Sequence, residues 1–146
     1  MAQWDQRTVL VTGASRGIGM ATAEHFASLG ARVGVVARSA EPLEALAARL
    51  GDKAHAVAAD LSDPAECARA VSEVEQALGP VDALISCAGV LHRDWVEDVA
   101  VGDFEESYRL GVGAAIWLTQ QVLPGMRERG FGRVVLVSSE LGLIGG

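Results

Sequence analysis

Short apolar runs alternate with longer segments of helical periodicity along the chain. The runs predict strands over residues 7–12, 32–37, 54–59, 81–86 and 133–137. Between them, apolar side chains three and four positions apart predict helices over residues 17–29, 41–50, 64–78 and 103–128. Such alternation is typical of a parallel sheet with right-handed crossovers and helices on both faces. The pattern therefore predicts a doubly wound α/β fold with about five strands, formed by residues 1–146 as a single domain.

Two of these helices carry more specific signals. The first helix is expected to pack through one face, which carries Ile18, Thr22, Phe26 and Leu29. The third helix begins with Pro64, and either Ser62 or Asp63 is expected to cap it, because both residue types accept hydrogen bonds from the first helical N–H groups. The first signal predicts which face of a helix is buried, and the second predicts where a helix begins.

Composition and charge exclude several classes of protein. Half of the residues are hydrophobic and 21% are charged, so a disordered chain is not expected. The formal net charge of −7 argues against a nucleic-acid partner, whose binding surface is typically basic. Apolar stretches such as residues 111–118 are much shorter than the roughly 20 residues that cross a bilayer, so we expect no membrane segment.

Two cysteines, Cys67 and Cys87, form neither a disulfide framework nor a metal set, which favours a cytoplasmic protein without a metal site.

A glycine-rich turn separates the first strand from the first helix. Residues 12–19 read Thr-Gly-Ala-Ser-Arg-Gly-Ile-Gly. A strand, a glycine turn and a helix in this order bind a dinucleotide pyrophosphate, because the first helical N–H groups and the helix dipole attract an anion. Gly13 would turn the chain, Gly17 would let the backbone approach the phosphates, and Gly19 would let helix and strand pack closely. In a chain with 17 glycines the turn also has a purely structural interpretation.

The end of the second strand bears on the choice of cofactor. In dinucleotide-binding folds an acid at this place binds the 2′-hydroxyl of NAD, whereas an arginine accommodates the 2′-phosphate of NADP. Here the strand ends in Ala37 and Arg38, with no carboxylate. Arg16, inside the glycine turn, offers a second positive charge. We therefore expect NADP(H) to be preferred over NAD(H), while two solvated arginines are the alternative interpretation.

Further motifs follow the later strands in a fixed order. Asp60-Leu61 comes after the third strand, Ala88-Gly89 after the fourth, and a Gly-Arg-Val-Val run at 132–135 leads into Ser138-Ser139. Together with the glycine turn, they resemble the short-chain dehydrogenase/reductase family over nearly the whole chain. The resemblance implies a doubly wound, Rossmann-type sheet and hydride transfer between NAD(P) and a small-molecule carbonyl or alcohol.

The resemblance also implies a role for individual residues. Those expected at the pyrophosphate and adenosine side are Gly13, Ser15, Arg16, Gly17, Ile18 and Gly19. Arg38 would face the 2′-phosphate, Asp60 would hydrogen-bond the adenine amino group, and Leu61 would contact the adenine ring. Ala88 and Gly89 would line the floor beneath the ribose.

Ser139 matches the family's catalytic serine, which hydrogen-bonds the substrate oxygen, but other active-site positions depart from the family pattern. Ser86 and Cys87 stand where the family generally has two asparagines, and Gly111 stands where it has an asparagine that holds a water. The family also needs a tyrosine, with a lysine four residues later, downstream of the serine. The single tyrosine, Tyr108, and the single lysine, Lys53, both precede it.

These departures predict a chain that carries the cofactor site and the catalytic serine but not the groups that transfer the proton. It is expected to be the N-terminal portion of an oxidoreductase of this family, with a fold incomplete at its C-terminal side. A non-catalytic NADP-binding protein and an interaction fragment are the alternatives. In the usual strand order 3-2-1-4-5-6, five strands leave residues 134–137 at an apolar sheet edge. We therefore expect a homo-oligomer, or association through residues 131–144 and the helix at 103–128.

Overall fold

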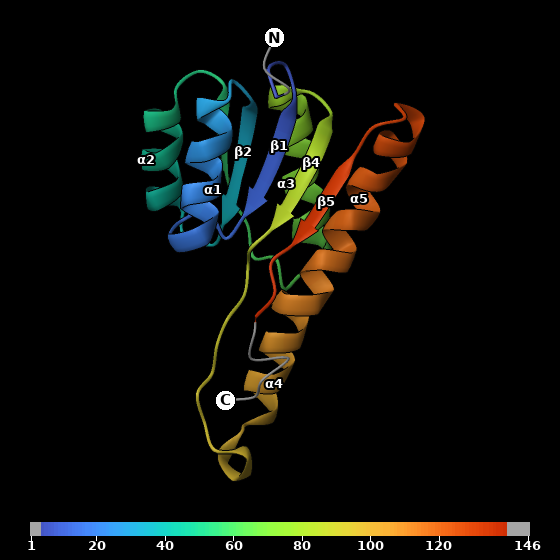
Figure 1. Ribbon diagram of the computed structural model, residues 1–146. Coiled ribbons are helices and arrows are strands. Elements are labelled where there is room, and N and C mark those ends of the chain that lie inside the picture. Colours follow the sequence, from blue (N-terminus) through green and yellow to red (C-terminus); the bar gives the residue numbers. More distant parts are fainter. Residues whose placement is uncertain (1–3, 140–146) are drawn as a thin grey trace.

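The computed structural model describes residues 4–139, which form one parallel sheet with helices on both faces (Figure 1). Its strands are β1 (Thr8–Thr12), β2 (Arg32–Ala37), β3 (Ala54–Ala58), β4 (Val81–Ser86) and β5 (Arg133–Leu136). They are ordered β3-β2-β1-β4-β5, and every neighbouring pair is parallel. The predicted doubly wound sheet, including its strand order, is therefore confirmed.

The helices form a layer on each face of the sheet. They are α1 (Gly17–Ser28), α2 (Ala40–Leu50), α3 (Pro64–Leu78), α4 (Val101–Tyr108) and α5 (Ala114–Glu128). Figure 1 shows α1 and α2 on one face of the sheet and α3 and α5 on the other. The segment after β4 and helix α4 extend past the carboxyl edge of the sheet.

Each strand of the sheet centre supplies both layers of the core, because successive side chains of a strand point to opposite faces. Leu10 of β1 packs with α3 and α5, whereas its neighbours Val9 and Val11 pack with α1 and α2. All three side chains are fully buried. Burial on both faces explains why these strands read as continuous apolar runs rather than alternating ones.

The single helix expected at 103–128 is interrupted. Helix α4 begins at Val101, two residues early, and the residues Arg109–Gly113 form a π turn before α5 begins. Gly111 and Gly113 lie in this turn, and glycine has a low preference for regular α-helix. The wider turn carries Leu110, whose side chain lines the pocket described below. The sequence pattern did not reveal this interruption, because the apolar periodicity continues across it.

Helix α1 packs only partly through the face expected. Its buried positions are Gly19 and Ala23, and Phe26 of the expected face packs against the same core, while Ile18 is 64% exposed. Small residues let the helix approach the sheet closely, and a face of larger side chains would hold it farther away. At α3, Asp63 is the cap, since its carboxylate accepts a hydrogen bond from the backbone N–H of Ala65 at 2.8 Å.

Strand β5 lies at the edge of the sheet, as expected. Val134, Val135, Leu136 and Val137 are all exposed. Residues 140–144, the last part of the segment expected to associate, lie outside the described residues. Among residues 4–139, no helix has both the length and the apolar character needed to cross a membrane.

Candidate functional site

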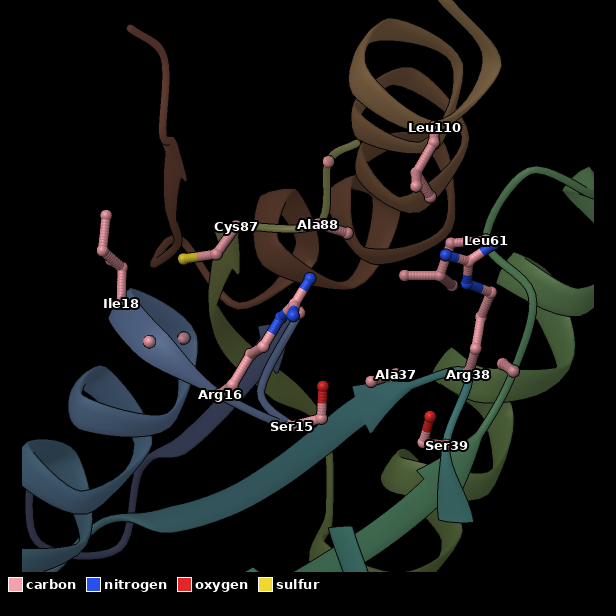
Figure 2. Close-up of a pocket in the computed structure, with 15 residues that line it drawn as sticks. Ser15, Arg16, Ile18, Ala37, Arg38, Ser39, Leu61, Cys87, Ala88 and Leu110 are labelled. Carbon is pink, nitrogen blue, oxygen red and sulfur yellow. The ribbon is translucent and has the colours of Figure 1, made fainter. Parts of the chain in front are cut away.

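A pocket of about 510 Å³ opens at the carboxyl ends of β1, β2 and β4 (Figure 2). The turn between β1 and α1 forms one side, and Arg38, directly after β2, contributes to another. Leu61 follows β3, Ala88 follows β4, and Leu110 reaches in from the π turn. Open parallel sheets bind ligands at this edge, at the point where the strand order reverses. The pocket size falls in the range of small-molecule and cofactor sites, roughly 300–1,000 Å³.

The glycine turn is packed too tightly for side chains at two positions. Gly13 adopts φ +64°, and a Cβ atom there would lie 2.9 Å from the carbonyl oxygen of Cys87. A Cβ atom at Gly19 would overlap the backbone of Gly13. The first turn of α1 can therefore lie directly against the ends of β1 and β4 only with glycine at both positions.

Thr12 fixes the turn to the neighbouring strand. Its fully buried side-chain oxygen accepts hydrogen bonds from the backbone N–H groups of Cys87, at 3.1 Å, and Ala88, at 3.2 Å. The backbone N–H of Ala14 donates to the carbonyl of Val36 on the other side, at 3.3 Å. Sequence reasoning assigned no role to Thr12, since its partners lie far along the chain.

The start of α1 leaves its first N–H groups open to the pocket. Arg16 precedes the helix in an extended conformation, and no side chain among residues 4–139 caps the helix. Gly17, Ile18 and Gly19, the first helical residues, all line the pocket. Unpaired N–H groups and the positive end of the helix dipole make such a terminus a binding site for anions. Figure 2 shows the Arg16 side chain reaching into the same space.

Arg38 is engaged by a carboxylate from a distant helix. Its Nη1 lies 3.2 Å from Oε1 of Glu106 on α4. The other oxygen of this carboxylate, Oε2, lies 3.2 Å from Nε2 of His92. Glu106 thus bridges the arginine at the pocket and a histidine of the segment after β4, a contact that the sequence did not reveal.

The comparison with known families settles the affiliation of this fold and pocket. The sequence model of the family described as short chain dehydrogenase matches residues 7–146. The chain belongs to the short-chain dehydrogenase family.

Similar proteins of this family are about twice as long as the chain. A short chain dehydrogenase of Pseudocercospora fijiensis is 39% identical over 144 residues, which cover 94% of this chain and 46% of that protein. The D-threitol dehydrogenase of Mycolicibacterium smegmatis is 34% identical over 139 residues, with coverage of 93% and 54%. A crystal structure of a short-chain dehydrogenase from Streptomyces avermitilis superposes with a TM-score of 0.89 at 35% identity, covering 97% of this chain and 52% of that one. The chain thus spans about half the length of these relatives.

Most residues that the resemblance to short-chain dehydrogenases assigned to the cofactor do lie together. The pocket is lined by Gly13, Ser15, Arg16, Gly17, Ile18, Gly19, Arg38, Leu61, Ala88 and Gly89. Asp60 is exposed and does not line it; Oδ1 of its carboxylate accepts hydrogen bonds from the backbone N–H and the hydroxyl of Ser62, at 3.0 and 2.8 Å. These two bonds hold the pKa of Asp60 below its ordinary value, and the charge of Arg38 adds to the effect.

Ser139 lies beyond the carboxyl end of β5 and is exposed. β5 pairs with β4 up to Ser86 and Leu136, and the backbone N–H of Val137 donates to the carbonyl of Ser86 at 2.9 Å. Ser139 therefore follows the same sheet edge as the pocket, although it does not line it.

The tyrosine and the lysine lie apart from the pocket. Tyr108 stacks on Phe104 along α4, with ring centroids 6.3 Å apart. Lys53 precedes β3, at the opposite edge of the sheet, where its Nζ lies 3.5 Å from Asp5 and donates to the carbonyl of Gly30. Neither side chain lines the pocket.

Cys87 occupies one of the positions where the chain departs from the family pattern. Its thiol lines the pocket opposite Ile18 (Figure 2). Burial raises the pKa of this thiol, so it is a weaker nucleophile than a solvated cysteine. Ser86, the other departure, is buried at the end of β4.

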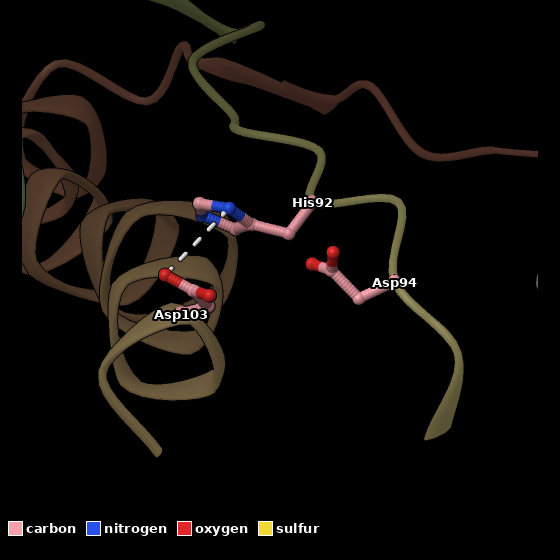
Figure 3. Close-up of side chains that lie close together, drawn as sticks. All are labelled: His92, Asp94 and Asp103. Atoms are coloured by element: carbon pink, nitrogen blue, oxygen red, sulfur yellow. Dashed lines mark ion pairs between the residues drawn. The ribbon is translucent and has the colours of Figure 1, made fainter. Parts of the chain in front are cut away.

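His92 also gathers two aspartates, which the sequence did not predict (Figure 3). One donor atom each of His92, Asp94 and Asp103 lie within 4.8 Å of one another, and Nδ1 of His92 lies 3.8 Å from Oδ1 of Asp103. These are metal-ligand types, but both ring nitrogens of His92 already face carboxylates, Asp103 and Glu106. The arrangement places His92 so that it holds Glu106 beside Arg38.

Proposed function

We propose that this chain is the dinucleotide-binding part of an oxidoreductase that transfers hydride between NADP(H) and a carbonyl or alcohol substrate. The observation that carries the proposal is the uncapped start of α1, which faces the pocket together with Arg16. Membership of the short-chain dehydrogenase family supports it. The names of two similar proteins, D-threitol dehydrogenase and ketoacyl reductase, are consistent with alcohol and carbonyl substrates.

The residues present fit a dinucleotide. The N–H groups of Gly17, Ile18 and Gly19 would donate to the pyrophosphate, since no side chain in the described chain satisfies this end of the helix. Arg16 adds a positive charge on the same side. Gly17 leaves no side chain between these N–H groups and the ligand, since a Cβ atom there would point into open space.

The adenosine end would lie on the β2 and β3 side. Leu61, which is buried beneath the pocket, offers an apolar surface to the adenine ring. Both Ser62 hydrogen bonds reach Oδ1 of Asp60, so Oδ2 can accept from the adenine amino group. Arg38 would donate to the 2′-phosphate, and this carries our preference for NADP(H). Ala88 and Gly89 would lie beneath the ribose.

The described residues would supply only part of the groups that the reaction requires. The bound nicotinamide would supply or accept the hydride. Ser139 would hydrogen-bond the substrate oxygen and orient it. Proton transfer to that oxygen needs a tyrosine whose pKa a nearby lysine lowers, and Tyr108 and Lys53 lie away from the pocket and from each other. That positional finding favours the second candidate, a protein that binds NADP(H) without turnover by this chain alone.

We further propose that the exposed face of β5 and the helix beside it associate with a second polypeptide or a second copy. Among residues 4–139, no helix covers the β5 face opposite α5. The unpaired thiols Cys67 and Cys87 suit a reducing compartment, so we propose that the protein acts in the cytoplasm.

Cofactor binding and turnover are tested in the same samples. NADPH and NADH binding is titrated by fluorescence, and NADPH oxidation is followed with a panel of ketones and aldehydes. Saturable binding without turnover supports a cofactor-binding part that needs another source of the proton donor. Turnover that Ser139→Ala abolishes shows a proton donor outside the expected motif. Absence of saturable binding of either dinucleotide overturns the proposal.

The preference for NADP(H) is tested separately with Arg38→Asp. This variant should lose affinity for NADPH and gain affinity for NADH, because a carboxylate repels the phosphate and accepts from the 2′-hydroxyl. An unchanged preference would remove Arg38 from the 2′-phosphate site.

A further inference from the structure

We propose that Glu106 sets the balance between NADP(H) and NAD(H), by competing with the 2′-phosphate for Arg38 and by offering a carboxylate to the 2′-hydroxyl. This inference rests on the proposed dinucleotide site. It places a specificity-determining residue on α4, far in sequence from the end of β2 where cofactor preference is usually encoded.

The position of Glu106 is fixed from two sides. Oε1 lies 3.2 Å from Nη1 of Arg38, and Oε2 lies 3.2 Å from Nε2 of His92. Asp103, one turn earlier on α4, lies 3.8 Å from the other ring nitrogen of His92. The carboxylate is therefore held beside the arginine instead of moving freely along the helix surface.

This contact changes what Arg38 presents to a ligand. The charge of Arg38 is partly balanced by Glu106. The carboxylate of Asp60, which follows β3, also interacts electrostatically with this arginine. A 2′-phosphate that approaches Arg38 must displace a carboxylate or share the guanidinium with it, and it is repelled by both acids. A guanidinium has five N–H donors and can bind both groups at once, so Glu106 weakens the binding of the 2′-phosphate to Arg38 but does not prevent it.

The carboxylate of Glu106 would favour a 2′-hydroxyl, whereas it repels a 2′-phosphate. An ionised carboxylate has about four acceptor positions, and Glu106 uses two of them on Arg38 and His92. A further position can accept the hydroxyl of an NAD ribose. Glu106 thus supplies the acid that is missing after β2, where the chain has Ala37 and Arg38.

The test compares Glu106→Gln with Glu105→Gln, by titrating NADP⁺ and NAD⁺ in both variants and the wild type. Glu105 is the matched control: it is exposed on the same helix and loses the same charge, and its side chain makes no ion pair or hydrogen bond among residues 4–139. Far-UV circular dichroism checks that each variant is folded. We expect Glu106→Gln to shift the ratio of the two Kd values about three- to fivefold toward NADP⁺, the effect of one exposed ion pair.

Three outcomes separate this inference from the proposed function. A shift with Glu106→Gln that is absent in Glu105→Gln, and smaller in an Arg38→Gln background, supports it. Saturable binding of both dinucleotides with equal ratios in the two glutamate variants overturns the role of Glu106 and leaves the proposed function standing. No saturable binding by the wild type overturns both.

Discussion

The side-chain oxygen of Thr12 lies 3.2 Å from the backbone nitrogen of Ala88 and accepts its hydrogen bond, although 76 positions separate the two residues. The same oxygen accepts from Cys87, so one hydroxyl satisfies two N–H groups where β4 ends. The floor of the pocket and the glycine turn are thereby held at a fixed separation. This is a structural role, and it also sets the geometry in which a ligand is bound.

Thr12→Val should therefore lower both stability and dinucleotide affinity. Valine keeps the shape of threonine but leaves two N–H groups near the pocket without their acceptor, which costs about 1–3 kcal/mol. Urea unfolding and NADP⁺ titration measure the two effects. Thr8→Val is the control: it removes a buried hydroxyl bonded to the carbonyl of Leu78, at the other end of β1, and should cost stability without weakening binding. Equal loss of affinity in both variants would contradict a local role of Thr12.

Gly19→Ala should disrupt the glycine turn. The added methyl group overlaps the backbone of Gly13, which cannot move without displacing the end of β1. We expect a loss of about 1–3 kcal/mol in the free energy of unfolding. We also expect at least about a tenfold loss of NADP⁺ affinity, as for one hydrogen bond to a charged group.

The matched control for Gly19 is Gly102→Ala, which places the same methyl group in α4, where no atom lies within 4 Å. It should leave binding unchanged and stabilise the protein by up to about 1 kcal/mol through helix preference. If the two variants behave alike in chemical unfolding and titration, close packing at Gly19 is not required.

The two cysteines should differ in reactivity. Burial, followed by the nearby charges of Asp63, Asp60 and Glu66, raises the pKa of Cys67 to about 11, and its side chain is fully enclosed. Cys87 lines the open pocket, and its pKa is raised by burial alone. Because the thiolate is the reactive form, alkylation at pH 8 should modify Cys87 first, and both rates should rise with pH.

Dinucleotide binding should protect Cys87 from this reaction. Iodoacetamide labelling followed by mass spectrometry, with and without saturating NADP⁺, measures the modification of each cysteine separately. Cys67 serves as the internal control, since its labelling should stay slow in both samples. Undiminished labelling of Cys87 at saturating cofactor would place the ligand elsewhere.

The edge of the sheet should make the chain self-associate. Val135 pairs in register with Ile85, which packs on the α1 side, so its side chain belongs to the face of β5 opposite α5. A lysine on an exposed edge strand opposes pairing with another chain. Val135→Lys should therefore shift the sedimentation profile toward monomer, whereas Val96→Lys, at an 87% exposed valine outside the sheet, should not. A wild-type chain that sediments as a monodisperse monomer would contradict this prediction.

The sequence by itself determined the sheet, its order and most of the pocket lining. Strand runs, helical periodicity and the glycine turn are local patterns, and Gly13 and Gly19 line the pocket where β1 leads into α1. Because the strands are parallel, the carboxyl ends of β1, β2 and β4 lie at the same edge of the sheet. Asp60, although next to the expected Leu61, does not line the pocket, and Ser62 holds one oxygen of its carboxylate.

Only the tertiary structure decided which distant side chains meet. The π turn at Arg109–Gly113 separates α4 from α5 and carries Leu110, which lines the pocket, and no periodicity marks it. Glu106 reaches Arg38 across 68 positions of sequence because α4 extends past the carboxyl edge of the sheet. Such contacts depend on how a whole helix is seated on its neighbours. A local pattern predicts that a helix forms, but the packing of its buried face fixes where its exposed carboxylates point.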